Sequence, residues 1–318
     1  MNKIDCYLQK HPFLVLDGAF GTELARRGFD TNDALWSARA LFEQPQLVQA
    51  VHQDYFAAGA DIATSASYQA TIEGFEKQGF TGGQARGLIQ LSVRLVQQAR
   101  DHYWKNAQPS GRPYPLVAAS VGPYGAYLAD GSEYSGHYGV NRAVLVDFHA
   151  ERLALLIAAN PDLLAFETLP VFTEAEALLQ ELHKYPDVYA WIAFSCSDEA
   201  HTCGGDAIAD CARFLNKEPQ AAAIGINCTA PQYVAGLIRA IRQQTTKPIV
   251  VYPNTGETYD PITKTWHGSA LPYHDYVRQW YEAGASLIGG CCRTTPQNIR
   301  DIAAFRRQLE SVAPGITD

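Results

Sequence analysis

The sequence lacks any long hydrophobic run. Nowhere in its 318 residues do about 18 apolar residues follow one another, so we expect no membrane-spanning helix. The N-terminal stretch MNKIDCYLQKHPF mixes charged and apolar residues and has no apolar core of a signal peptide. These two absences predict a cytoplasmic protein that has no membrane partner.

Cysteine and positive charge are also sparse. The seven cysteines are an odd number spread over the whole chain, which does not suit an extracellular disulfide framework and favours reduced thiols. Lysine and arginine number 25 against 33 acidic residues, a formal net charge of -8. A general phosphate-binding surface is therefore not expected, and nucleic acid is excluded as a partner.

The glycine-rich signatures of nucleotide binding are missing as well. The turn after the first apolar run reads DGAFGTEL rather than G-x-G-x-x-G, and no P-loop is present. GGQARG, at residues 82–87, has the wrong spacing and lies in a helix-like region. We expect no tightly bound nucleotide.

Short apolar runs alternate with amphipathic stretches eight times. Helix-like stretches at residues 45–60, 173–185, 232–244 and 274–285 separate such runs, and Gly59 stands where a helix C-cap is expected. Continuous apolar runs suit strands that are buried on both faces. The pattern predicts a single (β/α)8 TIM barrel over residues 1–318, with its core at about 11–305; a doubly wound sheet is the competing fold. The predicted strands are residues 13–20, 61–69, 115–124, 163–169, 189–196, 221–228, 248–254 and 286–292.

Nearly every predicted strand ends in a chemically useful residue. In a TIM barrel the active site is built at the C-terminal ends of the strands. Polar residues that merely mark the exit of a buried strand would explain some of these positions, but not an Asp, a Glu and several Cys. The strand-end residues are Asp17, Tyr68, Tyr124, Glu167, Cys196, Cys228, Asn254, Cys291 and Cys292.

The adjacent Cys291 and Cys292 are the most unusual of these residues. Successive side chains of a regular strand point to opposite faces, so both thiols can aim at one point only where the strand has ended or kinked. Gly289 and Gly290 would permit this through unusual backbone angles and close packing. Cys228 ends a strand two positions away around the barrel. Three converging thiolates predict a catalytic zinc site with an open fourth position.

Other interpretations of the cysteines remain open. Cys291 and Cys292 would also permit a vicinal disulfide, which is strained and rare. Cys6 and Cys211 are interpreted as small buried apolar residues. Cys196, Cys203 and His201 lie around a glycine-rich loop and suggest, more weakly, a second metal cluster.

Several motifs together resemble one known family. They are LDGAFGTEL, TSASYQA, SVGPYGAYLADGSEY, FETLP, GINC, VVYPNTGE and LIGGCCRTTP. Over roughly residues 11–305 the chain resembles the homocysteine S-methyltransferase family, and within it the S-methylmethionine-dependent branch. The resemblance implies a TIM-barrel enzyme that methylates L-homocysteine to methionine and binds one zinc ion per chain through Cys228, Cys291 and Cys292. A metal-bound thiol would lose its proton, which a free thiol with a pKa of about 8.5 mostly keeps at neutral pH.

The resemblance also implies residues for substrate binding. Asp17 and Glu167 are expected to hold the α-ammonium group of homocysteine, and the backbone N–H groups of Gly18 and Ala19 could meet its carboxylate. Asn227, directly before the first zinc ligand, is assigned to the same pocket. The alternative for Asp17 is a helix N-cap. Related zinc barrels place a tyrosine near the open metal position, and Tyr68 is the candidate here.

The methyl donor is expected to be a sulfonium compound, S-methylmethionine or S-adenosylmethionine. Aromatic faces and acids recognise such cations, and two long loops, around residues 122–139 and 253–268, carry both. These loops are interpreted as a donor-binding lid; the alternative is that their tyrosines only bury apolar surface. The donor candidates are Tyr124, Tyr127, Glu133, Tyr134, Asn254 and Trp266.

Related functions remain open. A selenohomocysteine or selenocysteine acceptor, or a betaine donor, would use the same chemistry. A thiol-based redox or zinc sensor is the alternative from another class, but it would not require Asp17 or Glu167. No folate or cobalamin cofactor is expected, because the chain carries no appended domain for either. The lack of the long C-terminal extension through which relatives assemble predicts a monomer or weak homodimer.

Overall fold

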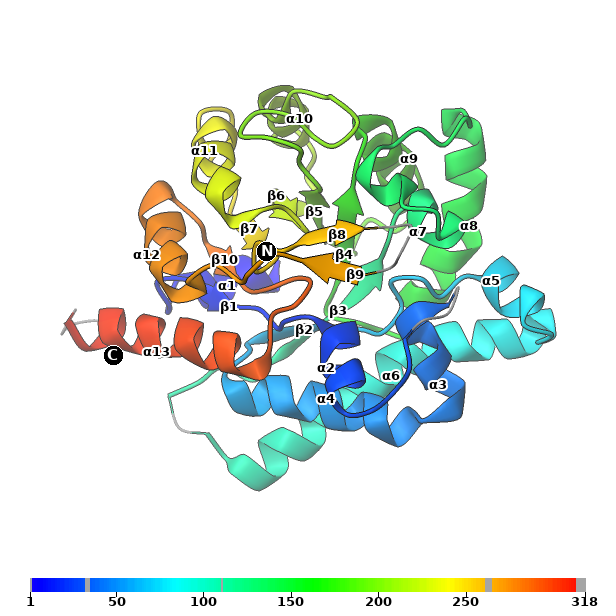
Figure 1. Ribbon diagram of the computed structural model, residues 1–318, viewed down its shortest axis with the longest axis horizontal. Coiled ribbons are helices and arrows are strands. Elements are labelled where there is room, and N and C mark those ends of the chain that lie inside the picture. The colour runs from blue at the N-terminus through cyan, green and yellow to red at the C-terminus, as the bar shows by residue number, and fades with distance from the viewer. Residues whose placement is uncertain (1, 32–34, 110, 261–264, 313–318) are drawn as a thin grey trace.

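The computed structural model describes residues 2–31, 35–109, 111–260 and 265–312 of the chain. Eight parallel strands form a barrel, and helices surround it (Figure 1). All eight predicted strands are present, and the TIM-barrel prediction is confirmed. The barrel strands are β1 (Leu14–Val15), β2 (Ile62–Thr64), β3 (Leu116–Val121), β4 (Leu163–Leu169), β5 (Ala190–Phe194), β6 (Ala221–Asn227), β7 (Ile249–Tyr252) and β10 (Leu287–Ile288).

Helices follow the strands along the chain, with two short 3-10 segments among them. The long α6 begins at Gly82, so the GGQARG stretch is helical. The helical segments are α1 (Lys3–Leu8), α2 (Phe20–Arg26), η1 (Trp36–Arg39), α3 (Ala40–Glu43), α4 (Pro45–Ala58), α5 (Ile72–Lys77), α6 (Gly82–Ala107), α7 (Tyr124–Leu128), η2 (Ser132–Tyr134), α8 (Arg142–Ala158), α9 (Phe172–Leu182), α10 (Ile208–Leu215), α11 (Pro231–Arg242), α12 (Tyr273–Ala283) and α13 (Pro296–Val312).

The barrel closes between its first two strands. The sheet order is β1-β10-β7-β6-β5-β4-β3-β2, and a parallel bridge joins Leu16 to Ile62. The N–H of Asp17 donates to the carbonyl of Ile62 at 3.0 Å, and that of Asp61 to the carbonyl of Val15 at 2.7 Å. Because closure leaves no free sheet edge, all eight C-terminal strand ends meet at one rim.

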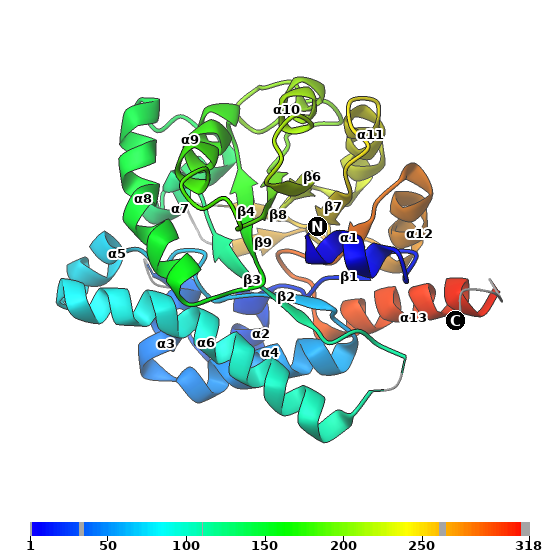
Figure 2. The ribbon, with the colours of Figure 1, turned by 180° about the vertical axis from the view of Figure 1, so that it is seen from behind.

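The core has two layers, which follow from the alternation of side chains along each strand. One set of strand residues fills the barrel interior and includes Leu14, Ala165, Trp191 and Val250. The intervening residues pack outward against the helices. Ile4 of α1 joins the inner set, so α1 covers the N-terminal end of the barrel. Figure 2 shows α1 at this end.

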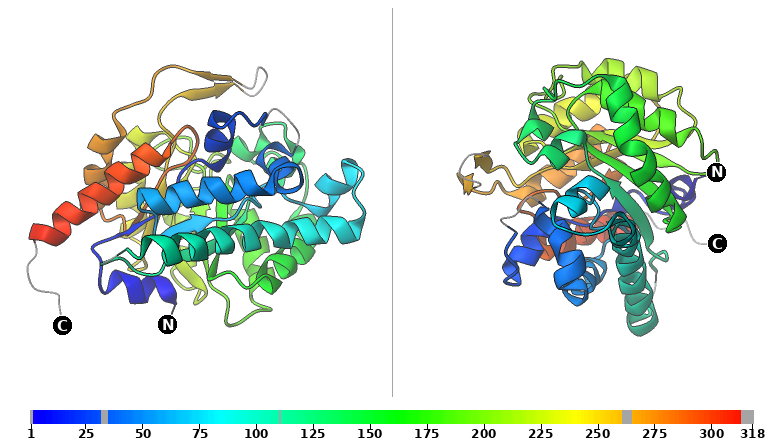
Figure 3. Two further views of the ribbon diagram at one scale, coloured as in Figure 1. Left: turned by 90° about the horizontal axis from the view of Figure 1, so that it is seen from below. Right: turned by 90° about the vertical axis from the view of Figure 1, so that its right-hand side faces the viewer.

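A hairpin lies at the opposite end of the barrel. Strands β8 (Thr258–Asp260) and β9 (Thr265–His267) pair antiparallel after β7, within the predicted second loop. The hairpin projects away from the barrel (Figure 3). The two long loops after β3 and β7 therefore both stand on the rim where the strands end.

Local sequence signals account for the helix boundaries. Helix α4 ends at Gly59, which has a φ of 121° in the region that favours glycine, and a Cβ there would lie 2.5 Å from Ala303.

None of the helices in the described part of the chain combines the length and apolar character that crossing a bilayer requires. That residues 1–318 form a single domain stays a prediction.

Candidate active site

Three cysteine sulfur atoms converge at the C-terminal rim. Cys228 follows β6, and Cys291 and Cys292 follow β10. The Cys292 sulfur lies 3.9 Å from that of Cys228 and 4.0 Å from that of Cys291. The sulfurs of Cys228 and Cys291 lie at disulfide distance from each other. The structure thus pairs Cys291 with the distant Cys228, not with its neighbour as the vicinal-disulfide alternative requires.

The backbone explains how neighbouring side chains reach one point. Strand β10 ends at Ile288, so regular alternation has stopped before Cys291. Neither Gly289 nor Gly290 has a positive φ, and the expectation of unusual backbone angles there is wrong. Close packing requires both glycines instead: a Cβ on Gly289 would lie 2.5 Å from the Cβ of Leu16, and one on Gly290 would lie 2.4 Å from Thr294 Oγ1.

The chemistry of the cluster suits a soft cation. Four ligands held about 2.3 Å from a tetrahedral zinc stand about 3.8 Å apart, close to the two separations made by Cys292. Burial raises the pKa of the Cys292 thiol to about 11, although a hydrogen bond with Tyr134 opposes this. Without a cation this thiol keeps its proton. Among the described residues, these three cysteines form the group with metal-ligand spacing.

Two buried carboxyl groups lie beside the cysteines. Asp17 is 5% exposed and accepts a 2.8 Å hydrogen bond from the N–H of Thr64. Burial raises the pKa of Asp17 to about 8; the Thr64 N–H opposes the rise, and Glu167 adds to it. Helix α2 begins at Phe20 with Ala19 as its N-cap and no side-chain cap, so the N-cap alternative for Asp17 is wrong.

Glu167, at the end of β4, is 7% exposed. Its carboxyl group accepts a hydrogen bond from the Ser120 hydroxyl, and the hydroxyl of Tyr252 also acts to lower its pKa. Burial nevertheless raises the pKa of Glu167 to about 7, against the effect of both hydroxyls and of Arg152. Among the described residues no cation pairs closely with Asp17 or Glu167. Two acids held in this way can bind a positively charged group of a ligand.

A cavity of about 740 Å³ connects these groups, a size within the usual range for small-molecule sites. Its lining comes from the loops after most of the strands. Sequence analysis did not single out several residues of this wall, because isolated polar side chains inside apolar runs give no distinctive signal. The lining residues it missed include Thr64, Ser120, Thr168 and Tyr252.

The structure brings most of the predicted substrate residues to the cavity. Gly18, Ala19 and Asn227 line it. The N–H of Ala19, however, donates to Thr294 Oγ1 at 3.1 Å, which leaves Gly18 as the candidate donor of the pair. The side-chain amide of Asn227 binds Thr168 through both its oxygen and its nitrogen. This geometry argues against direct substrate binding by the Asn227 amide.

Tyr68 lines the same cavity from the loop after β2. Its ring packs against Gly122, where a Cβ would lie 2.5 Å from the Tyr68 carbonyl oxygen. Arg152 of α8 donates to the carbonyls of Ser67 and Tyr68, each at 2.6 Å. Burial raises the pKa of Tyr68 well above its ordinary value, so its hydroxyl keeps its proton.

The predicted donor residues divide into two groups. Glu133 and Tyr134, around η2, line the cavity. Burial raises the pKa of Glu133 to about 7, and its Oε2 atom is buried without a hydrogen-bond partner in the described part of the chain. Tyr134 lies close to Cys292, and its hydroxyl acts to lower the pKa of the Cys292 thiol. These two residues remain donor candidates.

Tyr124 and Tyr127 are not among the described residues that line the cavity. Their rings pack against Phe148 of α8, with centroids 4.9 and 5.4 Å away, as the apolar alternative requires. This placement argues against a donor-binding role for either ring. Asn254 follows β7, and its N–H donates to the carbonyl of Thr229; its side chain is not among the described lining residues. Trp266 belongs to β9, but its side chain lies outside the described part of the structure.

The remaining cysteines lie away from the cavity. Cys211 is buried, as predicted, but Cys6 is only half-buried. Cys196 is buried and Cys203 half-buried, and the ring of His201 contacts Asp198 at 3.0 Å. Within the described residues these three do not form a group with metal-ligand spacing, so the second metal cluster is not supported.

Comparisons with known proteins agree with this geometry. The family described as "Homocysteine S-methyltransferase" matches residues 14–305. The chain is 52% identical over 314 residues to Homocysteine S-methyltransferase YbgG of Bacillus subtilis, which covers 98% of this chain and 100% of the relative. The crystal structure of the homocysteine methyltransferase MmuM from Escherichia coli in its metallated form is 44% identical, with a TM-score of 0.87, over 96% of this chain and all of that one. The oxidized form of MmuM gives the same values.

Proposed function

The chain belongs to the homocysteine S-methyltransferase family, and on this premise we propose that it transfers a methyl group from a sulfonium donor to the sulfur of L-homocysteine. One zinc ion, held by Cys228, Cys291 and Cys292, would serve this reaction. The observation that carries the proposal is the position of three converging thiols beside two buried carboxyl groups in one cavity. A metallated form of MmuM has been crystallised, which supports metal binding by this chain.

Zinc held by Cys228, Cys291 and Cys292 would lower the pKa of a substrate thiol. The cysteines themselves depend on a cation, because burial keeps the Cys292 thiol protonated near neutral pH. The hydroxyl of Tyr134, which lies close to Cys292 and acts to lower the pKa of its thiol, can donate to a thiolate at this position. The protein thus supplies soft ligands and a polar contact that favours their charged form.

Asp17 and Glu167 would hold the α-ammonium group of homocysteine. Their raised pKa values, about 8 and about 7, reflect burial without a partner cation, and an ammonium group between them would stabilise both carboxylates. The N–H of Gly18 is the candidate to meet the substrate carboxylate. This arrangement would orient the amino acid with its sulfur toward the cysteines, because the same cavity joins all of these groups.

The donor would approach from the side of Glu133 and Tyr134. A sulfonium carries a positive charge, and the unpartnered buried oxygen of Glu133 together with the rings of Tyr68 and Tyr134 offers it a counter-charge and aromatic faces. After the homocysteine thiol has released its proton to solvent, a lone pair of its sulfur forms the new S–CH3 bond while the donor S–CH3 bond breaks. The electron pair of that bond stays on the donor sulfur, which becomes a neutral thioether. With S-methylmethionine, both products are methionine.

The decisive experiment measures methionine formation by zinc-loaded protein given L-homocysteine and, in separate reactions, S-methylmethionine, S-adenosylmethionine or betaine. We expect turnover with a sulfonium donor, with S-methylmethionine preferred. Turnover with betaine alone would overturn the donor assignment. No methionine from any donor, with zinc shown to be bound, would overturn the proposed activity.

A further inference from the structure

One buried acid outside the cavity takes no part in the proposed chemistry. Glu174, in the first turn of α9, is 0% exposed and is not among the described residues that line the cavity. Its Oε1 atom accepts a 2.6 Å hydrogen bond from the N–H of Tyr124 and lies 2.9 Å from Nε2 of His149. Its Oε2 atom accepts a 2.9 Å hydrogen bond from the hydroxyl of Tyr138. Both oxygens of the carboxyl group therefore have partners.

Two of these partners bracket the loop that follows β3. Tyr124 is the first residue of α7, and Pro123 before it has no side-chain acceptor that could cap the N–H of Tyr124. Tyr138 lies near the other end of the same loop. Burial and the neighbouring Glu174 raise the pKa of Tyr138, so its hydroxyl keeps its proton and donates. One carboxyl group on α9 thus ties both ends of the loop to the barrel.

The segment between these two anchors reaches the cavity. Its described lining residues are Ala129, Gly131, Glu133 and Tyr134. The segment folds back on itself at Gly125, where a Cβ would lie 2.4 Å from the backbone nitrogen of Glu133 and 2.8 Å from the ring of Tyr138. Because these groups are closely packed, a shift of Tyr138 would also move Glu133.

Helix α8 supports the same loop from below. Its Arg152 is 3% exposed and donates to the carbonyl of Gly122, where the loop starts, at 3.0 Å. His149, which contacts Glu174, lies on the same helix and is 0% exposed. Burying charged groups costs free energy unless hydrogen bonds satisfy them. An apolar side chain would avoid this cost but would leave the loop without its hydrogen bonds.

We propose that Glu174 and Tyr138 are positioning residues for the methyl donor. Their hydrogen bond holds the loop in the conformation in which Glu133 and Tyr134 line the cavity. A freed loop would reduce the apparent affinity for the donor by the fraction of protein that keeps this conformation. The groups assigned to homocysteine stand at the ends of β1 and β4, outside the loop. The inference rests on the proposed function, because Glu133 and Tyr134 would meet the donor.

The test compares two tyrosine-to-phenylalanine variants in the same loop. Tyr138→Phe keeps the ring and removes the hydrogen bond to Glu174. We expect the KM for S-methylmethionine to rise about 5-fold or more, with the KM for homocysteine within about 2-fold of the unmodified value. Tyr127→Phe is the matched control, because the Tyr127 hydroxyl accepts from the exposed Lys77 and its ring packs on Phe148. Both KM values should stay within about 2-fold in this control.

A second pair of variants tests the acid. Glu174→Ala removes the anchors at both ends of the loop and should raise the donor KM more than Tyr138→Phe does. Glu174→Gln keeps an oxygen that accepts from the N–H of Tyr124 and gains an N–H that can donate to the Tyr138 oxygen, so its donor KM should stay within about 3-fold of the unmodified value. Zinc content and melting temperature are measured for all four variants. If Glu174→Ala fails to fold, Tyr138→Phe decides.

An unchanged donor KM in Tyr138→Phe, an equal rise of both KM values, or an equal effect in Tyr127→Phe would overturn the proposal. A donor KM in Glu174→Gln as high as in Glu174→Ala would do the same. If the unmodified protein makes no methionine, the proposed function fails separately. The anchors are then judged by amide hydrogen exchange over residues 125–137, which should be faster in Tyr138→Phe and unchanged in Tyr127→Phe. Equal exchange in both variants and the unmodified protein would overturn the positioning role.

Discussion

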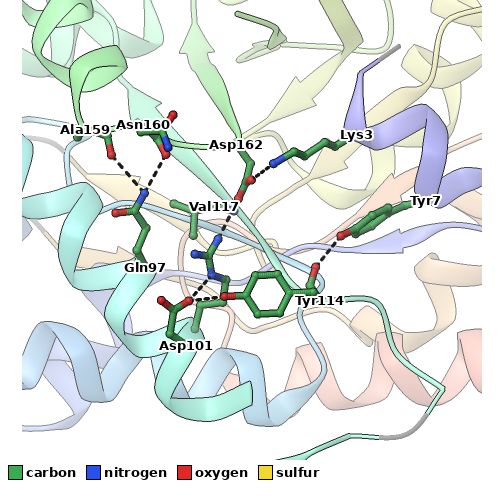
Figure 4. Close-up of polar contacts among 10 residues, drawn as sticks. Lys3, Tyr7, Gln97, Asp101, Tyr114, Val117, Ala159, Asn160 and Asp162 are labelled. Atoms are coloured by element: carbon green, nitrogen blue, oxygen red, sulfur yellow. Dashed lines mark hydrogen bonds and ion pairs between the residues drawn. The ribbon is translucent and has the colours of Figure 1, made fainter. Parts of the chain in front are cut away.

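The acidic residues at the two ends of the barrel differ in their partners. At the N-terminal end, Asp162 accepts from the N–H of Val117 at 2.8 Å, from Arg100 at 3.1 Å and from Lys3. Figure 4 shows this cluster, where the Tyr7 hydroxyl also donates to the carbonyl of Tyr114. Asp61 repeats the pattern before β2, with the N–H of Val15 and the guanidinium of Arg306. These acids are matched with cations and hold strands, helices and α1 together.

At the C-terminal end, two buried acids that line the cavity have no ion-pair partner among the described residues. Asp17 and Glu167 accept hydrogen bonds from the neutral groups of Thr64 and Ser120, and burial raises the pKa of each carboxyl group. Backbone strain gathers at the same end. Seven non-glycine residues in the described part of the chain have a positive φ, and five of them line the cavity: Trp36, Ala129, Thr168, Cys228 and Arg293. The comparison indicates that ion pairs at the N-terminal end stabilise the fold. At the C-terminal end, carboxyl groups without ion pairs and strained backbone positions are available for ligand binding.

The largest effect that would sharpen this contrast comes from a cysteine at each end. Cys292→Ser removes a soft ligand from the cluster, so we expect loss of bound zinc and a fall in methionine formation of about 1,000-fold or more. Cys6→Ser, on α1 at the other end, should leave both unchanged. Metal analysis and a methionine assay on the two variants check this. Stoichiometric zinc in Cys292→Ser would contradict the assignment of the cluster.

A substitution at the N-terminal end of the barrel should lower the stability of the protein and leave its activity unchanged. Asp61→Asn removes the nearer and more buried of the two carboxylates that contact the guanidinium of Arg306, which is 2% exposed, so we expect the free energy of unfolding to fall by about 3 kcal/mol. The kinetic constants of the folded enzyme should be unchanged. Urea unfolding measures the first effect, and steady-state kinetics measure the second. Asp210→Asn, which breaks the exposed pair with Arg213, is the control and should cost less than about 1 kcal/mol. Equal losses in the two variants would break the comparison.

The smallest expected effect is a pH dependence of homocysteine binding. Asp17 and Glu167 have folded pKa values raised to about 8 and about 7, so they are largely protonated at pH 6 and ionised above pH 8. Only the ionised forms pair with the substrate ammonium group, and kcat/KM for homocysteine should rise about 10-fold between pH 6 and pH 8. Glu167→Gln should weaken binding and flatten the part of the profile near pH 7. An unchanged profile in this variant would contradict the assignment of Glu167.

The same shifts set the sign of a stability effect in the free protein. In the unfolded chain both carboxyl groups ionise near pH 4, whereas the folded protein holds their protons up to about pH 7 and 8. The folded state therefore binds more protons in this window, and these two groups lower the stability as the pH rises through it. Homocysteine should offset this loss, which thermal melts with and without the substrate can measure.

Sequence reasoning recovered the barrel and the centre of the site for a local reason. Each strand is one continuous apolar run, and Asp17, Glu167, Cys228, Cys291 and Cys292 stand where such runs stop. Periodicity and run length are properties of neighbouring residues, so they can be read along the chain. The closure of parallel strands then brings their ends to one rim in any barrel of this kind.

The donor loops show where this reasoning stops. Tyr124, Tyr127, Glu133 and Tyr134 have similar chemistry and lie within eleven residues of one another, yet only the last two reach the cavity. Helix α7 turns the first two rings onto Phe148 of α8, a contact made by residues more than twenty positions away. Which side chains of a loop face the cavity depends on contacts with distant residues, and these contacts cannot be predicted from the loop sequence alone.

The sequence by itself determined the alternation of strands and helices, the strand ends that carry chemistry, and the family to which the chain belongs. Only the tertiary structure decided which polar atoms are free to act. The side-chain amide of Asn227 is hydrogen-bonded to Thr168, 59 residues away, and the N–H of Ala19 is hydrogen-bonded to Thr294, 275 residues away. The positive φ of Thr168 is likewise imposed by its surroundings against the preference of its side chain. Hydrogen bonds between distant segments and strained backbone angles are set by how the chain packs, because no local pattern encodes them.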